Sequence, residues 1–285
     1  MPLPGYKPQA EDTSIDADIF LFEKLRQFSP VQKTQRVKTF NQSVRKMALF
    51  SLKRTFPQAS PPELTQAYVN QKLLTFNLPK SSDQLLDKLM ILDPISLAQN
   101  IAEILNPLDI PYMVGGSVAS SLWGEERSTQ DLDLVIDLQS VKVAPLVAAM
   151  SAEFYINEAT VTEAMNNESS FNAIHLFSAE KVDFFVLPND DFSRSKFSRR
   201  QPYRVSEDPN IDLYLYSPED IVLQKLRWYT LTGMQSQKQW RDVLGVLKVQ
   251  RLSLDWVYLK QWAEFLQLTS LLNQGLQESG LEMGE

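Results

Sequence analysis

Residues 112 to 136, YMVGGSVASSLWGEERSTQDLDLVI, form the stretch that decides the fold. A short apolar run ends in Gly115, Gly116 and Ser117, a short helical segment follows, and a second apolar run begins at Asp131. Side chains two residues apart in a strand share a face, so Asp131 and Asp133 are expected to point the same way. Mg²⁺ is usually bound by one or two carboxylates together with the phosphates of a substrate. The stretch therefore predicts a site for Mg²⁺ and a phosphorylated ligand.

The glycine turn has two explanations. Glycines leave the backbone open, so a phosphate can approach the main-chain N–H groups at the start of the following helix, where the helix dipole favours an anion. Ser117 is placed to cap that helix or to contact a phosphate, and Gly124 is placed to end it. The alternative is a tight turn between a strand and a helix. The turn alone does not distinguish a binding loop from a structural one.

The aspartates are more specific, because acids are poor strand formers and need a partner among apolar neighbours. A third acid, Asp183, lies in the apolar run from Val182 to Leu187. Three convergent carboxylates can bind two Mg²⁺ ions, or bind one while the third acts as a base on an attacking hydroxyl. An exposed edge strand is the alternative explanation for the first pair. An ion pair with Lys181 or Arg127 is the alternative for Asp183.

These motifs together resemble the nucleotidyltransferase superfamily related to DNA polymerase β. The pattern Arg127-x-Thr129-x-Asp131-x-Asp133 further resembles the Arg-x-Thr-x-Asp-x-Asp motif of AbiEii/AbiGii-type toxin nucleotidyltransferases and related bacterial nucleotidyltransferases. The resemblance implies an α/β (α+β) fold with a small mixed β-sheet core flanked by helices. It also implies a Mg²⁺ cofactor and transfer of a nucleotide from a nucleoside triphosphate to an acceptor.

The resemblance assigns roles to ten residues. Downstream of the core motifs, Lys225 and Arg241 resemble the family's helical lysine and Arg/Lys-Asp pair, and charge on a leaving pyrophosphate needs fixed cations. Solvated charges on ordinary helices are the alternative explanation for both. The implied catalytic and metal-binding residues are Asp131, Asp133 and Asp183, and the implied nucleotide-binding residues are Gly115, Gly116, Ser117, Arg127, Thr129, Lys225 and Arg241.

Composition limits the class of protein. The chain has 285 residues, a formal net charge of −7 and no cysteine, so disulfides and cysteine-ligated zinc are excluded. The amino end lacks the layout of a signal peptide and no apolar run reaches membrane-spanning length, so a cytoplasmic protein without membrane contact is expected. The segment from Lys24 to Arg54 contains no acidic residue and is locally basic.

Apolar spacing and helix caps predict the order of the elements. Two amphipathic helices are expected between Ile19 and Phe50, with Ser29 and Pro30 between them and with the charged side chains on the outer faces; a third helix is expected from Ser60. Two strand-like runs, Phe171 to Phe177 and Val182 to Leu187, are separated by a gap of hairpin length. The predicted division is a loose tail (1–12), a basic helical module (13–78), a connector (79–93), the core (94–216) and a helical C-terminal region (217–285).

Several other residues are weaker candidates. His175, the only histidine, is expected to be a hydrogen-bonded core residue rather than a catalytic one. Trp228, Tyr229 and Trp240 either stack on a base or, as the better explanation, pack a pair of helices. A basic loop is predicted to guide the phosphates of an RNA acceptor, or simply to be solvated; it contains Arg194, Lys196, Arg199, Arg200 and Arg204.

The main functional hypothesis is a Mg²⁺-dependent nucleotidyltransferase acting on an RNA, protein or small-molecule hydroxyl. The alternative from another class is a nucleotidyltransferase-fold module that binds RNA or a partner protein of toxin–antitoxin type without catalysis, through the segment from Lys24 to Arg54. A transferase of the antibiotic-modifying kind is a third possibility that only acceptor screening separates from the first.

Overall fold

The computed structural model describes residues 4–75, 92–129 and 131–281. Its internal contacts divide the chain into two compact units. Unit 1 comprises residues 1–34, 115–126 and 190–285, and unit 2 comprises residues 35–114 and 127–189. The two units alternate along the chain, whereas the division predicted from the sequence is linear. Most of the predicted connector, 79–93, lies outside the described residues.

Unit 2 contains a mixed sheet with the strand order β3-β4-β5-β2-β1. Strands β2 and β5 are parallel, and the other neighbours are antiparallel. The two runs with a hairpin-length gap pair as β4 and β5, which confirms that prediction. The strand bounds are β1 Tyr112–Val114, β2 Leu132–Ile136, β3 Phe154–Tyr155, β4 Ser170–His175 and β5 Lys181–Val186.

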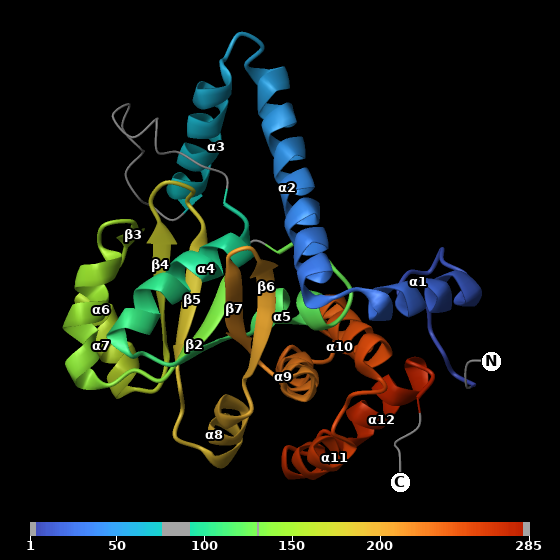
Figure 1. Ribbon diagram of the computed structural model, residues 1–285. Coiled ribbons are helices and arrows are strands. Elements are labelled where there is room, and N and C mark those ends of the chain that lie inside the picture. The colour runs from blue at the N-terminus through green and yellow to red at the C-terminus, as the bar shows by residue number, and fades with distance from the viewer. Residues whose placement is uncertain (1–3, 76–91, 130, 282–285) are drawn as a thin grey trace. The chain divides into compact units, whose positions relative to one another are not determined.

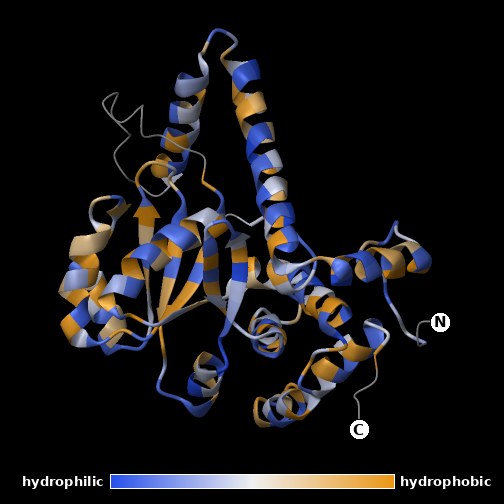
Figure 2. Ribbon diagram, in the orientation of Figure 1, coloured by the Kyte–Doolittle hydropathy of each residue, from blue (hydrophilic) through white to orange (hydrophobic). Residues whose placement is uncertain are grey.

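Helices flank this sheet, as Figure 1 shows, and the predicted α/β class is confirmed. Helix α4 begins after Asp93, whose carboxylate accepts hydrogen bonds from the N–H groups of Ile95 and Ser96. Its buried side chains recur at helical spacing and face β2. In Figure 2 the strands of the sheet are largely hydrophobic. The flanking helices are α4 Pro94–Leu105, η2 Asn106–Leu108, η3 Ser140–Lys142, α6 Val143–Met150 and α7 Glu158–Asn166.

Two helices, α2 (Pro30–Thr55) and α3 (Pro61–Thr75), form an antiparallel pair (Figure 1). Residues 35–55 of α2 and all of α3 belong to unit 2. As predicted, α3 starts after Ser60, whose N–H and hydroxyl both donate to the Glu63 carboxylate, at 2.6 and 2.7 Å. The inner face of α3 packs on the β4–β5 connection, where Val69 and Leu73 contact Ile174 and Ala179.

Unit 1 is built around α10, which packs against α1, α5, α9 and α12. The contact with α5 is so close that a Cβ atom at Gly124 would lie 2.9 Å from the carbonyl carbon of Gly245. A hairpin of β6 and β7 completes the unit. The bounds are α1 Ile15–Gln27, α5 Gly116–Trp123, α8 Asp191–Ser198, β6 Gln201–Glu207, β7 Asn210–Leu215, α9 Pro218–Leu231, α10 Gln237–Gln250, α11 Trp256–Phe265 and α12 Thr269–Glu278.

The basic loop predicted between residues 190 and 204 is wrong, because this segment forms α8 and the start of β6. Lys196 is only 5% exposed, and its ammonium donates to Gln224 and lies over the Phe192 ring. Burial lowers the pKa of Lys196 to about 8. Lys196 therefore takes part in the packing of unit 1 rather than contributing to a free basic surface.

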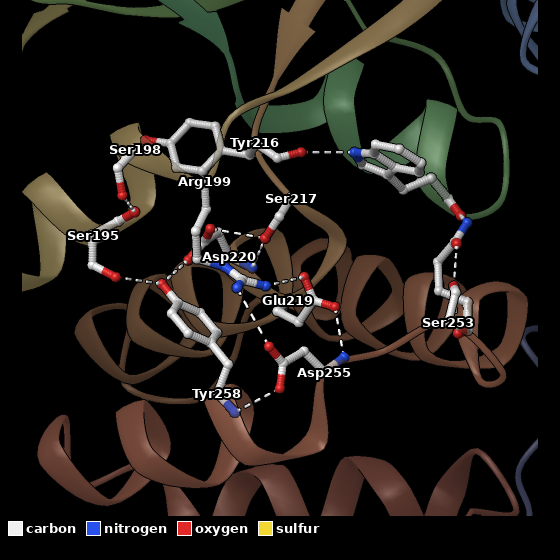
Figure 3. A network of polar contacts seen from close by, with 12 residues as sticks. Ser195, Ser198, Arg199, Tyr216, Ser217, Glu219, Asp220, Ser253, Asp255 and Tyr258 are labelled. Atoms are coloured by element: carbon white, nitrogen blue, oxygen red, sulfur yellow. Dashed lines mark hydrogen bonds and ion pairs between the residues drawn. The ribbon is translucent and has the colours of Figure 1, made fainter.

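Arg199 belongs to a polar network that joins α8, α9 and α11 (Figure 3). Its guanidinium contacts the carboxylates of Glu219 and Asp255, each at 3.3 Å. The Tyr258 hydroxyl donates to Asp220 at 2.7 Å. Burial raises the pKa of Asp220 to about 6, although the hydrogen bonds from Tyr258 and Ser217 lower it. The network ties three helices of unit 1 together.

The amino-terminal segment also differs from its prediction. A loose tail is expected over residues 1–12, but the Tyr6 hydroxyl and the Gln9 N–H both donate to Asp18. Asp18 forms an ion pair with Lys248 at 2.7 Å, and both side chains are at most 2% exposed. A run of prolines with few apolar residues gives no signal for this arrangement, because the partners lie far along the chain.

Candidate functional site

Two acidic residues of unit 2 lie side by side near the start of two parallel strands. The register of β2 and β5 places Asp133 directly beside Asp183. Asp131 precedes Leu132, the first residue of β2, and is exposed. Adjacent strands lie about 4.8 Å apart, so side chains in register on one face are near neighbours. The fold thus brings two distant parts of the chain, and two of the three predicted carboxylates, side by side.

Lys181 is the cation of this acidic cluster. Its ammonium lies 2.8 Å from the Asp183 carboxylate, which is the ion pair considered as an alternative for that residue. Partial burial lowers the pKa of Lys181, but the hydrogen bond to Asp183 and the charges of Asp183, Asp131 and Asp133 raise it above its ordinary value. All three predicted carboxylates therefore act on one ammonium group.

The donor set suits a hard cation, since carboxylate oxygens are the ligands that Mg²⁺ prefers. The ammonium of Lys181 already shows that positive charge is stabilised at this position. Over residues 4–75, 92–129 and 131–281, however, no group of three His, Cys, Asp or Glu side chains is arranged to hold a metal ion. The assignment of Asp131, Asp133 and Asp183 as metal ligands stays a prediction.

The segment before β2 is held by α2. The N–H of Thr129 donates to the side chain of Asn41 at 3.0 Å, and the Thr129 hydroxyl donates to the carbonyl of Asp131 at 3.1 Å. Arg127 donates to the carbonyl of Ser128. Thr129 is 6% exposed. Its hydroxyl shapes the backbone at Asp131 in this structure, while nucleotide binding by Arg127 and Thr129 stays a prediction.

A cavity of about 540 Å³ lies in unit 2 beside this segment. It is lined by parts of α2 (41–55) and α3 (68–75) and by Ser128 and Thr129. Beside it Glu180, 1% exposed, contacts Lys72 at 2.7 Å and Arg45 at 3.3 Å. Burial raises the pKa of Glu180, the two cations lower it, and the charge of Asp131 raises it. This cluster therefore interacts electrostatically with the acidic site.

No pattern in the sequence predicts this cavity. The charges of α2 are predicted to lie mostly on outer faces, and Arg45 is an exception, because it is only 5% exposed. Arg45 follows Val44 and occupies an inward position of the helix. Arg45 is buried because it pairs with Glu180, which lies far along the chain. No local sequence pattern predicts this pair.

The glycine turn belongs to unit 1 and has a structural explanation at both positions. Gly116 has φ +55°, a conformation that favours glycine. A Cβ atom at Gly115 would lie 2.5 Å from the ring of Tyr216. Gly124 ends α5, as predicted, with its N–H donating to Ser120 at 2.8 Å. Phosphate binding by Gly115, Gly116 and Ser117 stays a prediction.

The two downstream cations have protein partners in unit 1. Lys225 is 5% exposed, and its ammonium lies 2.7 Å from the Asp242 carboxylate, which also accepts from Ser120. Arg241 contacts the Glu125 carboxylate through two nitrogens, at 2.9 and 3.1 Å. Both contacts are those of structural ion pairs. A role for Lys225 or Arg241 toward a triphosphate stays a prediction and would require these pairs to open.

The weaker candidates have structural roles. His175 is 1% exposed, and its Nδ1 hydrogen-bonds Ser178 at 2.8 Å, which confirms the predicted core position. Burial lowers the pKa of His175 to about 4. Tyr229 and Trp240 pack across α9 and α10 with ring centroids 5.1 Å apart, which confirms helix packing for these two residues.

Comparison with known proteins gives the following. No family model and no curated protein matches the chain. Among solved structures, an antigenic nucleotidyltransferase-like protein from Paracoccidioides brasiliensis is 18% identical, covers 64% of this chain and 92% of its own, and gives a TM-score of 0.41. The antibiotic-resistance factor ANT(2″)-Ia is 14% identical, covers 63% and 100%, and gives a TM-score of 0.32. Likenesses this distant assign no family.

Among the described residues, no helix combines the length and the apolar character needed to cross a bilayer.

Proposed function

We propose that the chain is a Mg²⁺-dependent nucleotidyltransferase that moves a nucleoside monophosphate from a nucleoside triphosphate to an acceptor hydroxyl. The observation that carries the proposal is the register of β2 and β5, which sets Asp133 beside Asp183 with Asp131 two residues earlier. Carboxylates placed together on apolar strands lower the stability of the fold unless a cation neutralises them. A site for a cation bound to phosphate explains their presence.

In this proposal Asp131 and Asp133 hold the metal ion, which when bound neutralises charge on the phosphates. Asp183 completes the site or accepts the proton of the acceptor hydroxyl. Lys181 holds the Asp183 carboxylate in place through the 2.8 Å ion pair. Arg127 and Thr129, which belong to the same unit as the three aspartates, are proposed to contact the nucleotide.

The transfer is an in-line substitution at the α-phosphorus. The acceptor oxygen forms a bond to phosphorus, the bond to the pyrophosphate oxygen breaks, and pyrophosphate leaves. The proton of the acceptor hydroxyl passes to a carboxylate, for which Asp183 is the candidate. Such catalysis consists mainly of positioning and charge stabilisation, so it needs few reactive side chains.

Transfer from labelled nucleoside triphosphates tests the proposal, with Mg²⁺ and with RNA, protein and small-molecule acceptors screened in turn. Asp133→Asn and Asp183→Asn are expected to lower the rate at least 100-fold, in line with the loss of a metal ligand or a general base. Asp137→Asn removes the same charge just beyond the far end of β2 and is the matched control. Equal transfer by the wild type and Asp133→Asn across all four nucleotides would refute the proposal.

A non-catalytic module is the second candidate, and the observation that favours it is the ion pair of Lys181 with Asp183. An ammonium that neutralises the acids permanently leaves no need for Mg²⁺. Calorimetry separates the two candidates. Mg²⁺ strengthens triphosphate binding to the enzyme, and Asp133→Asn abolishes this gain, whereas triphosphate binding to a non-catalytic module shows no gain from Mg²⁺.

A further inference from the structure

The cavity between α2, α3 and residues 128–129 contains features that the proposed reaction does not use. None of the described residues that line it is acidic, whereas Arg45 and Lys72 both line it. Arg45, Lys72 and the nearby Glu180 together carry a formal charge of +1. With a volume of about 540 Å³, the cavity has the size of a site for one small organic molecule. Its charge favours an anionic ligand over a cationic one.

The hydrogen-bonding groups near the cavity are incompletely satisfied. Arg45 is 95% buried, and none of the described residues gives its Nη1 a hydrogen-bond acceptor. Lys72 uses one of its three ammonium donors on Glu180. Buried donors normally have partners, so a guanidinium nitrogen without one marks a place where a ligand oxygen completes the set.

The rest of the lining is suited to a ring and a sugar. Leu52 and Ala48 present apolar surface, and Ser51 and Thr55 present hydroxyls. Thr129 lines the same cavity and lies two residues before Asp131. The lining of the cavity is therefore adjacent in sequence to the acidic site, and Asp131 acts electrostatically on Glu180 beside the cavity.

We propose that this cavity binds one nucleotide unit of the acceptor, with its phosphate toward Lys72 and Arg45. The acceptor role rests on the proposed function, but the binding does not. The unit is either a free nucleotide or the end of an oligonucleotide, which share this chemistry. The charge of the cavity disfavours cationic acceptors such as aminoglycosides.

Calorimetric titration without Mg²⁺ tests the binding, with adenosine monophosphate, a short oligoribonucleotide, neutral adenosine and an aminoglycoside as probes. The phosphate-bearing probes are expected to bind at least tenfold more tightly than adenosine, and more weakly as salt rises. Tighter binding of adenosine monophosphate indicates a free nucleotide as the ligand, and tighter binding of the oligoribonucleotide indicates the end of an oligonucleotide. Failure of both to bind, or equal binding of adenosine or the aminoglycoside, would overturn the proposal.

Matched variants locate the site. Ser51→Tyr fills the cavity from an exposed position of α2, and Ser43→Tyr makes the same change at an exposed position of that helix outside the cavity. Ser51→Tyr is expected to weaken nucleotide binding at least tenfold and Ser43→Tyr less than twofold. Wild-type affinity of Ser51→Tyr for the nucleotide would contradict the proposal.

A second pair of variants removes one positive charge each. Lys72→Met is expected to weaken binding at least tenfold, whereas Lys46→Met, at an exposed position of α2 outside the cavity, leaves it within twofold. Equal effects of the two substitutions would show that only overall charge matters and would reject the site. Because Lys72 pairs with buried Glu180, circular dichroism checks that the variant is folded, and Ser51→Tyr remains the decisive variant if it is not.

Asp133→Asn separates this inference from the proposed function. The variant is expected to bind the nucleotide probe like the wild type, because the aspartate does not line the cavity. Loss of transfer with retained binding supports both proposals. Transfer unaffected by Asp133→Asn refutes the enzyme alone, and binding unaffected by Ser51→Tyr refutes the cavity alone.

Discussion

Acidification is expected to destabilise unit 2 through His175. The side chain lies in β4, is 1% exposed, and its ring nitrogen Nδ1 is bonded to Ser178. Burial lowers its pKa from 6.5 to about 4. In the unfolded chain the imidazole is in water and takes up a proton near pH 6.5. The unfolded state therefore binds more protons between pH 6.5 and pH 4, and acid favours unfolding in this range.

The magnitude follows from proton linkage. Each pKa unit between the folded and unfolded states corresponds to about 1.4 kcal/mol. A folded pKa depressed to about 4 leaves stability unaffected above pH 6.5 and lowers it as the pH drops from 6.5 to 4. Between pH 7 and pH 4 the loss is about 3 kcal/mol. Such a loss is a substantial part of the stability of an ordinary domain.

Urea unfolding at pH 7, 5.5 and 4 measures this effect, with His175→Gln as the variant that cannot titrate. All five tryptophans lie in unit 1, so their fluorescence does not report on β4. Hydrogen exchange of peptides covering residues 170–186 follows unit 2 instead. The wild type is expected to lose about 3 kcal/mol more than the variant between pH 7 and pH 4. An equal loss in both proteins would show that His175 does not titrate as its burial requires.

Three other perturbations have defined outcomes. Lys181→Met removes the ammonium partner of Asp183, so we expect a lower melting temperature without divalent cations and tighter Mg²⁺ binding in calorimetry; unchanged values for both would contradict the role of this lysine. Asp18→Ala leaves the Lys248 ammonium buried without its carboxylate and is expected to lower the free energy of unfolding of unit 1 by about 3–5 kcal/mol in urea titrations followed by tryptophan fluorescence. Gly116→Ala forces a side chain into φ +55° and is expected to cost about 1–2 kcal/mol in the same titration; no change would mean that the turn relaxes.

Local signals explain which elements the sequence predicts. The Ser217 cap followed by Pro218 marks the start of α9, and the Ser217 hydroxyl accepts from the Asp220 N–H in the structure. The gap between two apolar runs marks the β4–β5 hairpin. In both cases the interacting residues lie within a few positions of each other. Patterns of this kind require no knowledge of the tertiary fold.

Tertiary partners explain the failures. The composition of the basic stretch predicts that Arg45 lies on the surface, but it is buried in an ion pair with Glu180. The segment around Lys196 has the composition of a polar loop, but it forms α8, and the buried Lys196 ammonium donates to Gln224 of α9. For the candidate site, the sequence identifies the three acids but not the register that sets Asp133 beside Asp183. Pairing between distant strands depends on contacts that no local window contains.

The parallel pairing of β2 with β5 also has a consequence for the order of folding. The β4–β5 hairpin joins neighbours in the chain and closes a short loop, whereas β2 joins β5 only after α6, β3, α7 and β4 have been accommodated between them. Closing a long loop costs more entropy and slows folding. The acidic pair is therefore expected to form after the β4–β5 hairpin, so a chain that has formed only this hairpin does not yet carry the site.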